Sequence, residues 1–398
     1  MTLAVWILCS WIPASAETQL PERAEGPEAG AFPAEVSKEI DELVEHHILQ
    51  RELPGAVVLV GCRDRVVFSK AYGNRSVEPV VEVMTVDTVF DLASLTKVLA
   101  TAPAVMLLAE RGKVKLEDPV SRYLPAFGQQ GKGKVTVQQL LVHYSGLPAD
   151  LRLSRRRKTS PKSLLTRIYQ SRLRSRPGEQ FNYSDLGFIV LGKLVEKISG
   201  KALDRFASEH LFNPLQMSRT RFLPDIAEIA AIAPTERRRD GRMMRGAVHD
   251  PLASKLGGVA GDAGLFSTAQ DLSRFCQMLL NGGSLDGVRI FRPETIARMT
   301  SAQSPEGKPN VRGLGWDIQS TYSSVKGGFF SNTSYGHTGF TGTSIWIDPQ
   351  TQSYLILLTN RLHPEGKGTV KELRTELANV VGKALQPQAA ETNGPDVP

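Results

Sequence analysis

Ser94-Leu95-Thr96-Lys97 opens a long apolar segment, 94–111, whose composition predicts a buried helix. A serine and a lysine three residues apart lie on the same face of a helix, within reach of each other. A serine hydroxyl becomes a good nucleophile when a neighbouring group takes its proton. A lysine amine takes that proton if burial disfavours its charged form. The same pattern recurs at Ser323-Ser324-Val325-Lys326, so further motifs must decide between the two serines.

The second motif is Asn182-Tyr183-Ser184-Asp185, which precedes a segment with helical periodicity. Tyr183 is therefore expected just ahead of a helix N-terminus. A charged Lys97 nearby would lower the pKa of the phenol from its reference value of about 10. On its own, the motif favours a simpler interpretation, in which Ser184 or Asp185 caps the helix and the tyrosine is exposed.

The third motif is Tyr335-Gly336-His337-Thr338-Gly339-Phe340-Thr341-Gly342-Thr343. A glycine-rich strand lets a substrate backbone approach closely, and its free edge can pair with a peptide-like substrate. The N–H groups of Phe340 and Ser94 are candidates for an oxyanion hole. His337 is a candidate donor to a substrate carboxylate or a participant in proton transfer. Two further residues of this motif are predicted to bind substrate: Thr338 and Gly339. The alternative is a glycine-rich hairpin with a fully hydrogen-bonded histidine.

The order of predicted elements defines the fold class. Helical spacing covers 34–49 and 370–385, and the signals between about 94 and 280 are mainly helical. β-branched and aromatic runs predict strands, of which the first two form a hairpin: 56–61, 66–72, 344–347 and 354–359. An α+β architecture follows. The first and last segments share one antiparallel sheet flanked by helices, and the middle forms a mostly helical second lobe, with a cleft between them.

Two local features of the helical middle are also predicted. Pro103 should kink or interrupt the first helix, because it lacks a backbone donor. Ser267-Thr268-Ala269-Gln270 resembles a capping box before the helix that contains Leu272.

The chain has 398 residues with a composition ordinary for a globular protein. Residues 1–16 are apolar and end in Ala14-Ser15-Ala16, which predicts a signal peptide and a secreted or periplasmic protein; an uncleaved start is the alternative. Three further regions are expected: a flexible leader, 17–33; a single catalytic domain, 34–385; and a disordered tail, 386–398. Within the catalytic domain, an α/β lobe is expected from about 34–90 and 285–385, and a helical lobe from about 91–284.

The net charge of +7 raises the question of a polyanionic partner. The basic clusters at 155–158 and 237–239 are expected to be solvated loops, and no aromatic residues interleave with them, which argues against nucleic-acid binding. No other stretch reaches about 18 consecutive apolar residues, so no transmembrane helix is expected after cleavage. Neither a metal nor an organic cofactor is predicted. Cys62 and Cys276 are expected to be free and buried, with a disulfide as the alternative. The oligomeric state is not indicated.

Taken together, the three motifs occur in an order that resembles the serine active-site β-lactamase and penicillin-recognising family. The most similar branch contains class C β-lactamases, DD-peptidases and family VIII carboxylesterases. Matching stretches extend the resemblance over about 35–385: Phe90-Asp91-Leu92-Ala93-Ser94, Leu116-Glu117-Asp118-Pro119-Val120, His143-Tyr144-Ser145-Gly146-Leu147-Pro148 and the run from Gly257 to Thr268. The resemblance rejects Ser323 as nucleophile, because that serine falls after Tyr183 and just before His337.

The resemblance implies a β-lactamase/transpeptidase-like fold and an acyl-enzyme mechanism. Ser94 would attack a carbonyl carbon while Lys97 and Tyr183 share the proton transfers. The amides of Ser94 and Phe340 would stabilise the oxyanion, and water would hydrolyse the ester intermediate. Whether Tyr183 or Lys97 is the base stays open, because coupled groups titrate as a unit.

Two departures from the family pattern bear on the substrate. His337 stands where class C β-lactamases usually have lysine. Asp185, which is also predicted to bind substrate, stands where the second motif usually ends in asparagine. A carboxylate cannot donate to a substrate amide carbonyl, and it favours protonated Lys97, which moves the base role toward Tyr183. Arg361 is a candidate for the missing positive charge at a substrate carboxylate, with a surface salt bridge as its alternative role.

The predicted function is that of a serine hydrolase acting on D-amino-acid peptides or small esters, with no nucleic-acid partner. A β-lactamase is the nearest alternative. An alternative of another class is a non-catalytic protein that captures penicillin or peptidoglycan peptides.

Overall fold

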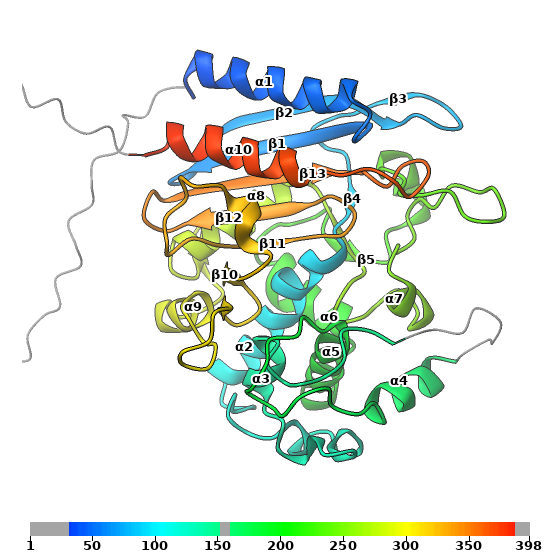
Figure 1. Cartoon of the computed structure of the whole chain (residues 1–398), viewed down its shortest axis with the longest axis vertical. Helices are drawn as coiled ribbons and strands as arrows, with labels where there is room; N and C mark the ends of the chain where they lie inside the picture. The colour runs from blue at the N-terminus through cyan, green and yellow to red at the C-terminus, as the bar shows by residue number, and fades with distance from the viewer. Residues whose placement is uncertain (1–31, 152–159, 387–398) are drawn as a thin grey trace, which may run out of the picture.

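The computed structural model describes residues 32–151 and 160–386 (Figure 1). The predicted signal peptide, nearly all of the predicted leader and tail, and the basic cluster 155–158 lie outside the described residues.

One antiparallel sheet organises the described residues. Its strand order is β3-β2-β1-β13-β12-β11-β10-β9. The strand bounds are β1 (Gly55–Cys62), β2 (Arg65–Ser76), β3 (Glu82–Val83), β9 (Val311–Arg312), β10 (Asp317–Gln319), β11 (Tyr335–Thr338), β12 (Ser344–Asp348) and β13 (Ser353–Thr359). β1 and β13 pair with Ala56 opposite Thr359, so the first and last segments meet in the middle of the sheet. The predicted α+β fold with a shared antiparallel sheet is confirmed.

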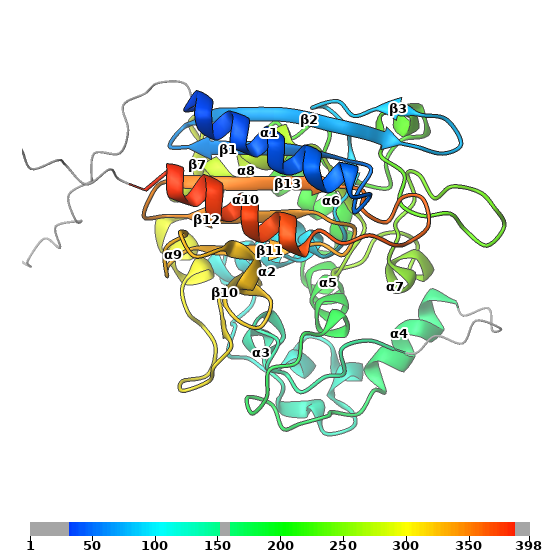
Figure 2. The ribbon, with the colours of Figure 1, turned by 45° about the horizontal axis from the view of Figure 1, so that its top comes forward.

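Helices cover both faces of this sheet. α1 (Ala34–Leu49) and α10 (Lys371–Ala384) lie side by side across one face (Figures 1 and 2). α8 (Ala269–Leu280) packs against β1 and β13 from within the segment predicted to form the helical lobe. Successive residues of β1 therefore alternate between two cores: Val58 packs with the α1–α10 side and Val57 with the α8 side.

The remaining helices form the lower part of the molecule in Figure 1. Their bounds are α2 (Ala102–Glu110), α3 (Val137–Leu141), α4 (Pro161–Tyr169), α5 (Asp185–Ser199), α6 (Leu203–Ala207), α7 (Pro251–Lys255) and α9 (Pro293–Thr300). α5 packs against α2 and α3, and it ends at Gly200, whose φ of 71° suits a residue without a side chain. A small sheet, β4-β6-β5, joins Phe90–Asp91, Leu265–Ser267 and Arg221–Phe222.

The nucleophile segment departs from the single helix predicted for 94–111. Ala93–Leu95 is a 3₁₀ turn, Lys97–Thr101 is π-helical, and regular α-helix begins only with α2. Pro103 lies in the first turn of α2, directly after the π-helical residues 97–101. The 94–111 helix is therefore irregular, as predicted, but the irregularity lies on the N-terminal side of the proline.

Two other local predictions need correction. The N-cap of α8 is Thr268 rather than Ser267, and its side chain accepts the Asp271 N–H, so the capping signal was placed one residue early. Cys62 and Cys276 are both free, but only Cys276 is fully buried.

Among the described residues, one helical run passes a length-and-hydropathy test for a membrane span. It is Ala93–Glu110, and 83% of it is buried inside the protein. Burial of this kind is typical of a core helix, which passes the same test.

Candidate active site

A strained turn presents Ser94. Ala93, the residue before it, has a φ of 46°, in the left-handed region that residues with a side chain rarely adopt. The buried carboxylate of Asp91 holds the turn, because it accepts the Ala93 N–H at 2.9 Å and the His249 N–H at 2.7 Å. Burial raises the pKa of Asp91 to about 6, against the opposing effect of these hydrogen bonds. Strain of this kind is common where a reactive group must be held in place.

Lys97 lies fully buried beside Ser94. Its Nζ is 3.0 Å from Ser94 Oγ, 2.9 Å from the Asp262 carbonyl oxygen and 2.7 Å from Asp185 Oδ1. An ammonium group has three protons, and here each faces an oxygen. The 94–97 spacing thus produces the predicted contact, although the local geometry is 3₁₀ and π rather than α.

The charge state of Lys97 follows from its partners. Burial acts to lower its pKa, but the negative charge of Asp185 acts in the opposite direction, as the charge of a deprotonated Tyr183 would, and the net pKa lies above its ordinary value. Lys97 is therefore an ammonium ion in this arrangement.

Tyr183 completes the group of three. It precedes Ser184, the N-cap of α5, whose hydroxyl accepts the Gly187 N–H at 3.3 Å. The centre of the Tyr183 ring is 5.2 Å from Lys97 Nζ. Burial raises the pKa of the Tyr183 phenol, while the charge of Lys97 and hydrogen bonds to Ser94 and Lys97 lower it; the net pKa lies above its ordinary value.

His143 packs against the Tyr183 ring, a contact that the sequence reasoning missed. The two rings lie 4.3 Å apart between centroids, at an interplanar angle of 30°. His143 Nδ1 accepts the Ser184 N–H at 3.0 Å, so the ring proton sits on Nε2. Burial holds the pKa of His143 well below its ordinary value, which keeps the imidazole neutral.

His337 reaches the site from β11. Its ring centre is 5.9 Å from that of Tyr183, and Nδ1 donates to the Thr338 carbonyl at 2.9 Å. Nε2 is then an acceptor, and it is buried without a partner among the described residues. Burial, together with the nearby charge of Arg312, holds the pKa of His337 well below its ordinary value. This histidine therefore brings no positive charge to a substrate carboxylate.

Arg312 is a second residue that the sequence reasoning missed. It is 1% exposed, donates to the Gly315 carbonyl at 2.8 Å and pairs with Asp317 at 3.5 Å. Its charge acts on His143, His337 and Tyr183 from inside the protein. Arg312 therefore acts on the electrostatics of the site from within the protein interior.

The turn after β11 brings Phe340 against the nucleophile segment. Thr341 Oγ1 donates to the Asp91 carbonyl at 2.6 Å, and Thr343 Oγ1 donates to the Leu92 carbonyl at 3.1 Å. A Cβ on Gly339 would lie 2.5 Å from that same Leu92 oxygen, so this position requires glycine. The turn that contains the predicted oxyanion donor is thus joined directly to the turn that contains Ser94.

Arg361 does not contact Ser94, Lys97 or Tyr183. Its Cζ lies 4.8 Å from the Phe340 ring centre, and Nη1 donates to the Gly368 carbonyl at 2.7 Å. The alternative surface salt bridge is not observed either, because no carboxylate pairs with Arg361 within the described ranges.

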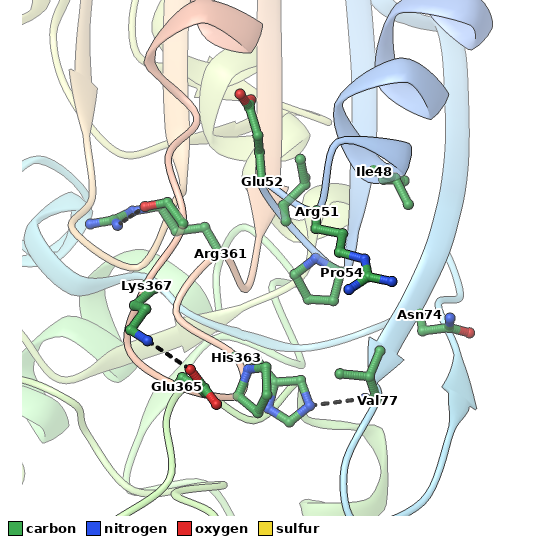
Figure 3. A pocket seen from close by; sticks show the side chains of 13 residues that line it. Ile48, Arg51, Glu52, Pro54, Asn74, Val77, Arg361, His363, Glu365 and Lys367 are labelled. Atoms are coloured by element: carbon green, nitrogen blue, oxygen red, sulfur yellow. Dashed lines mark hydrogen bonds and ion pairs between the residues drawn. The ribbon is translucent and has the colours of Figure 1, made fainter.

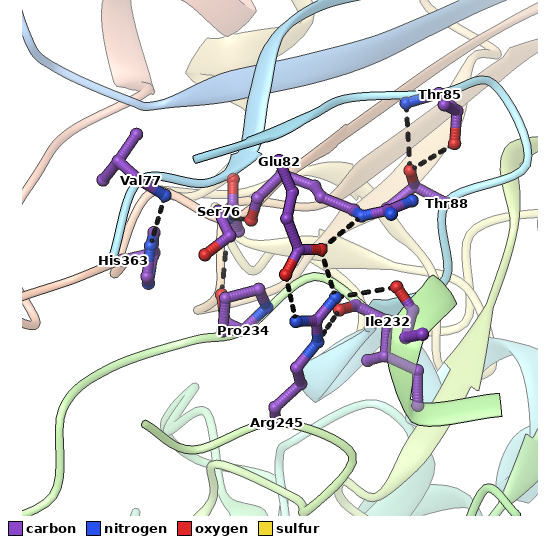
Figure 4. A network of polar contacts seen from close by, with 12 residues as sticks. Ser76, Val77, Glu82, Thr85, Thr88, Ile232, Pro234, Arg245 and His363 are labelled. Atoms are coloured by element: carbon purple, nitrogen blue, oxygen red, sulfur yellow. Dashed lines mark hydrogen bonds and ion pairs between the residues drawn. The ribbon is translucent and has the colours of Figure 1, made fainter. Parts of the chain in front are cut away.

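A cavity of about 530 Å³ lies behind Arg361, between the end of α1 and the loop 361–368 (Figure 3). His363 on this loop accepts the Val77 N–H at 2.9 Å. Next to it, Glu82 pairs with Arg245 and Arg75 and anchors β3 to the body of the protein (Figure 4). Ser94, Lys97 and Tyr183 do not line this cavity.

The competing serine motif has no such arrangement. Ser323 Oγ donates to the Ser320 carbonyl at 2.8 Å. Lys326 Nζ donates to backbone carbonyls and to Ser334 Oγ at 3.2 Å, and not to Ser323. No group of three or more His, Cys, Asp or Glu side chains suited to a metal ion occurs among the residues that the structure describes.

Comparisons with known proteins agree with one another. The family model described as Beta-lactamase matches residues 36–379. A protein of Escherichia coli (strain K12) named "Putative D-alanyl-D-alanine carboxypeptidase" is 31% identical over 373 residues, which is 85% of each chain. The structure of EstCE1, a hydrolase with promiscuous acyltransferase activity, is similar with a TM-score of 0.71 and 22% identity, over 87% of this chain and 98% of that one. A family VIII carboxylesterase is similar with a TM-score of 0.69 and 19% identity, over 89% and 99%. The two structural likenesses concern the fold.

Proposed function

The chain belongs to the beta-lactamase family of serine hydrolases, and we propose that it cleaves small esters or D-amino-acid peptides through an acyl-enzyme on Ser94. The observation that most directly supports this proposal is the 3.0 Å approach of Lys97 Nζ to Ser94 Oγ, with the centre of the Tyr183 ring 5.2 Å from the same Nζ.

In the proposed acylation, the deprotonated form of Tyr183, a minor form at neutral pH because the pKa of the phenol is raised, takes the Ser94 proton as Oγ bonds to the substrate carbonyl carbon. The N–H groups of Ser94 and Phe340 then stabilise the oxyanion. Collapse of the tetrahedral intermediate breaks the bond to the leaving group, which receives the proton. A water molecule subsequently attacks the Ser94 ester, gives up a proton by the same route and releases the acid.

The base role goes to Tyr183 because Lys97 is held as an ammonium ion. Two of the Lys97 partners, the Asp262 carbonyl and the Asp185 carboxylate, only accept hydrogen bonds. A neutral amine would satisfy this geometry only by accepting from Ser94, and the Asp185 charge at 2.7 Å disfavours that state. Lys97 then serves to stabilise the tyrosinate and the serine oxygen.

The charges near the nucleophile favour uncharged ester substrates. His337 is neutral, and Arg361 lies over Phe340 instead of beside Ser94. Asp185 is occupied by Lys97 and brings no free donor to a substrate amide. A β-lactam or a peptide C-terminus presents a carboxylate that these groups do not neutralise. D-Alanyl peptides remain the second candidate because of the name of the 31% identical relative.

A parallel panel tests the substrate class. Purified protein and its Ser94→Ala variant are assayed with p-nitrophenyl butyrate, nitrocefin and a D-Ala-D-Ala peptide. The proposal expects the highest kcat/KM with the ester, a lower value with the peptide, the lowest with nitrocefin, and no turnover by Ser94→Ala. Nitrocefin as the best substrate would make the protein a β-lactamase instead.

We also propose that residues 1–16 direct secretion and are removed after Ala16. Expression of the full chain in a bacterium that has a Sec pathway, followed by intact-mass measurement of the exported protein, would show a chain starting at Glu17. A cytoplasmic product that retains residues 1–16 would contradict this.

A further inference from the structure

Arg374 lies on α10, far from Ser94 in the sequence, yet its side chain ends at the turn that contains Phe340. One guanidinium nitrogen, Nη2, donates to the Gly339 carbonyl at 3.0 Å and to the Thr343 carbonyl at 2.7 Å. No carboxylate pairs with this arginine among residues 32–151 and 160–386, and its Nε is buried without a partner. Placing a cation here without an opposite charge costs free energy, which calls for a reason other than stability.

The two carbonyls are the closing groups of the turn. The Gly339 N–H donates to the Thr343 carbonyl at 2.7 Å, and the Gly342 N–H donates to the Gly339 carbonyl at 3.1 Å. Each carbonyl oxygen has two lone pairs. With Arg374 added, each accepts two hydrogen bonds, so both peptide planes are fixed.

The orientation of the Phe340 N–H follows from the planarity of the peptide. In a trans peptide unit, the C=O and the N–H of the next residue point in opposite directions. Arg374 holds the Gly339 carbonyl on the α10 side, which turns the Phe340 N–H to the opposite side, away from α10. Within the described residues, no protein group accepts a hydrogen bond from this N–H.

The same contact changes the strength of the donor. A cation at a carbonyl oxygen polarises the peptide unit and makes its N–H a better hydrogen-bond donor. The turn is also tied to the nucleophile segment through Thr341 and Thr343. Arg374 thus acts on a donor whose distance from Ser94 is already set by other contacts.

We propose that Arg374 is a positioning residue that orients and polarises the Phe340 N–H of the oxyanion hole. This inference rests on the proposed acyl transfer at Ser94, because an oxyanion hole has a role only in that chemistry.

The test compares Arg374→Gln with Arg374→Lys and with the control Lys383→Gln, which removes one positive charge from an exposed position of the same helix. Each protein hydrolyses p-nitrophenyl butyrate and its thiono analogue, in which sulfur replaces the carbonyl oxygen. Sulfur is a weak acceptor, so an intact oxyanion hole gives a high oxygen-to-sulfur ratio of kcat/KM.

Arg374→Gln is expected to lower kcat for the oxygen ester by roughly 10- to 100-fold with little change in KM, a smaller loss than removal of an oxyanion donor causes. Its oxygen-to-sulfur ratio should fall by about tenfold. Arg374→Lys should lie between this variant and the wild type, and Lys383→Gln should match the wild type. If Arg374→Gln does not fold, the Arg374→Lys ratio decides.

An unchanged ratio in every folded Arg374 variant would overturn the inference, even if activity fell. Its failure is distinguishable from failure of the proposed function, since in the latter case the wild-type protein would hydrolyse neither ester.

Discussion

At the scale of single residues, the account depends on how protons are shared among Ser94, Lys97 and Tyr183. The structure brings together residues separated by almost 90 positions, and it adds Asp185 as an ion partner of the lysine. The side chains thus form one coupled group, in which a change to one residue alters the proton affinity of the others.

Tyr183→Phe removes the proposed base and leaves the ring in place against His143. We expect kcat to fall by roughly 10²- to 10⁴-fold, the usual contribution of a general base, with an unchanged thermal unfolding midpoint. Steady-state ester hydrolysis and a melting curve check this. Loss of less than a factor of ten would assign the base role to Lys97.

Asp185→Asn should move the pH dependence of kcat/KM toward acid. The pKa values of Lys97 and Tyr183 are both raised, and the negative charge of Asp185 contributes to each. The base is therefore mostly protonated at neutral pH, and the rate should climb as pH rises. Removing the carboxylate lowers both pKa values, so the climb should begin at lower pH. A profile measured from pH 5 to 10 that shifts toward alkali would contradict this sign.

At the scale of secondary-structure elements, close backbone contact between α5 and the segment 257–264 sets the floor of the site. A Cβ on Gly261 would lie 1.9 Å from the Phe188 carbonyl of α5. Thr101 Oγ1 donates to the Gly261 carbonyl at 2.7 Å, and the next carbonyl, that of Asp262, receives Lys97.

Gly261→Ala should therefore force the two elements apart. Overpacking of this kind typically costs about 1–3 kcal/mol, and displacement of Asp262 should also lower kcat. Urea denaturation and ester hydrolysis measure the two effects. Gly133→Ala is the matched control, because the nearest atom to its added Cβ lies at 3.6 Å. Equal free energies of unfolding for the two variants would refute the proposed contact.

The elements that were predicted well have a distinct local pattern. The 34–49 helix was predicted with the bounds of α1 because its apolar residues follow helical spacing. Strand runs within β1 and β13 were recognised as short continuous apolar runs, typical of strands buried on both faces. The 3₁₀ and π geometry at 93–101 was not predicted, since packing against neighbouring segments decides it. The predicted cap of α8 is one residue early because Ser267 and Thr268 both belong to the preferred capping residue types.

Tertiary packing also limits how much of the site the sequence predicts. Ser94, Lys97, Tyr183 and His337 belong to short motifs that the sequence displays directly. Arg312, which is buried, and Arg374, which is half-buried, reach the site as single side chains from distant segments, so no local spacing indicates them. His143 lay within a recognised stretch, but its φ of 60° and its contact with Tyr183 are tertiary features.

At the scale of the whole molecule, several buried histidines give the stability a pH dependence. The pKa values of His143, His337 and His363 all lie below the ordinary value, mainly through burial, and that of His363 is about 4. At these three positions, the unfolded chain therefore binds more protons than the folded protein below pH 6.5. This contribution to stability is complete above pH 6.5 and is lost as the pH falls toward 4.

For His363 alone, the loss in free energy of unfolding is on the order of 3 kcal/mol. The raised pKa of Asp91 changes the free energy of unfolding in the opposite direction between about pH 4 and 6. The informative quantity is thus the difference in pH slope between the wild type and a His363 variant. Urea denaturation at pH 7.5, 6.5, 5.5 and 4.5 should give a shallower pH slope for His363→Gln than for the wild type. Equal or steeper slopes for the variant would show that His363 is protonated in the folded protein.

The central claim is that Ser94 forms a covalent bond with a substrate carbonyl, and labelling tests it most directly. The wild type, Ser94→Ala and Tyr183→Phe are incubated with a fluorophosphonate, and the adducts are mapped by peptide mass spectrometry. The account predicts one adduct per chain, on Ser94, formed more slowly in Tyr183→Phe and absent from Ser94→Ala. Labelling of Ser323 in the wild type, or undiminished labelling of Ser94→Ala, would contradict it.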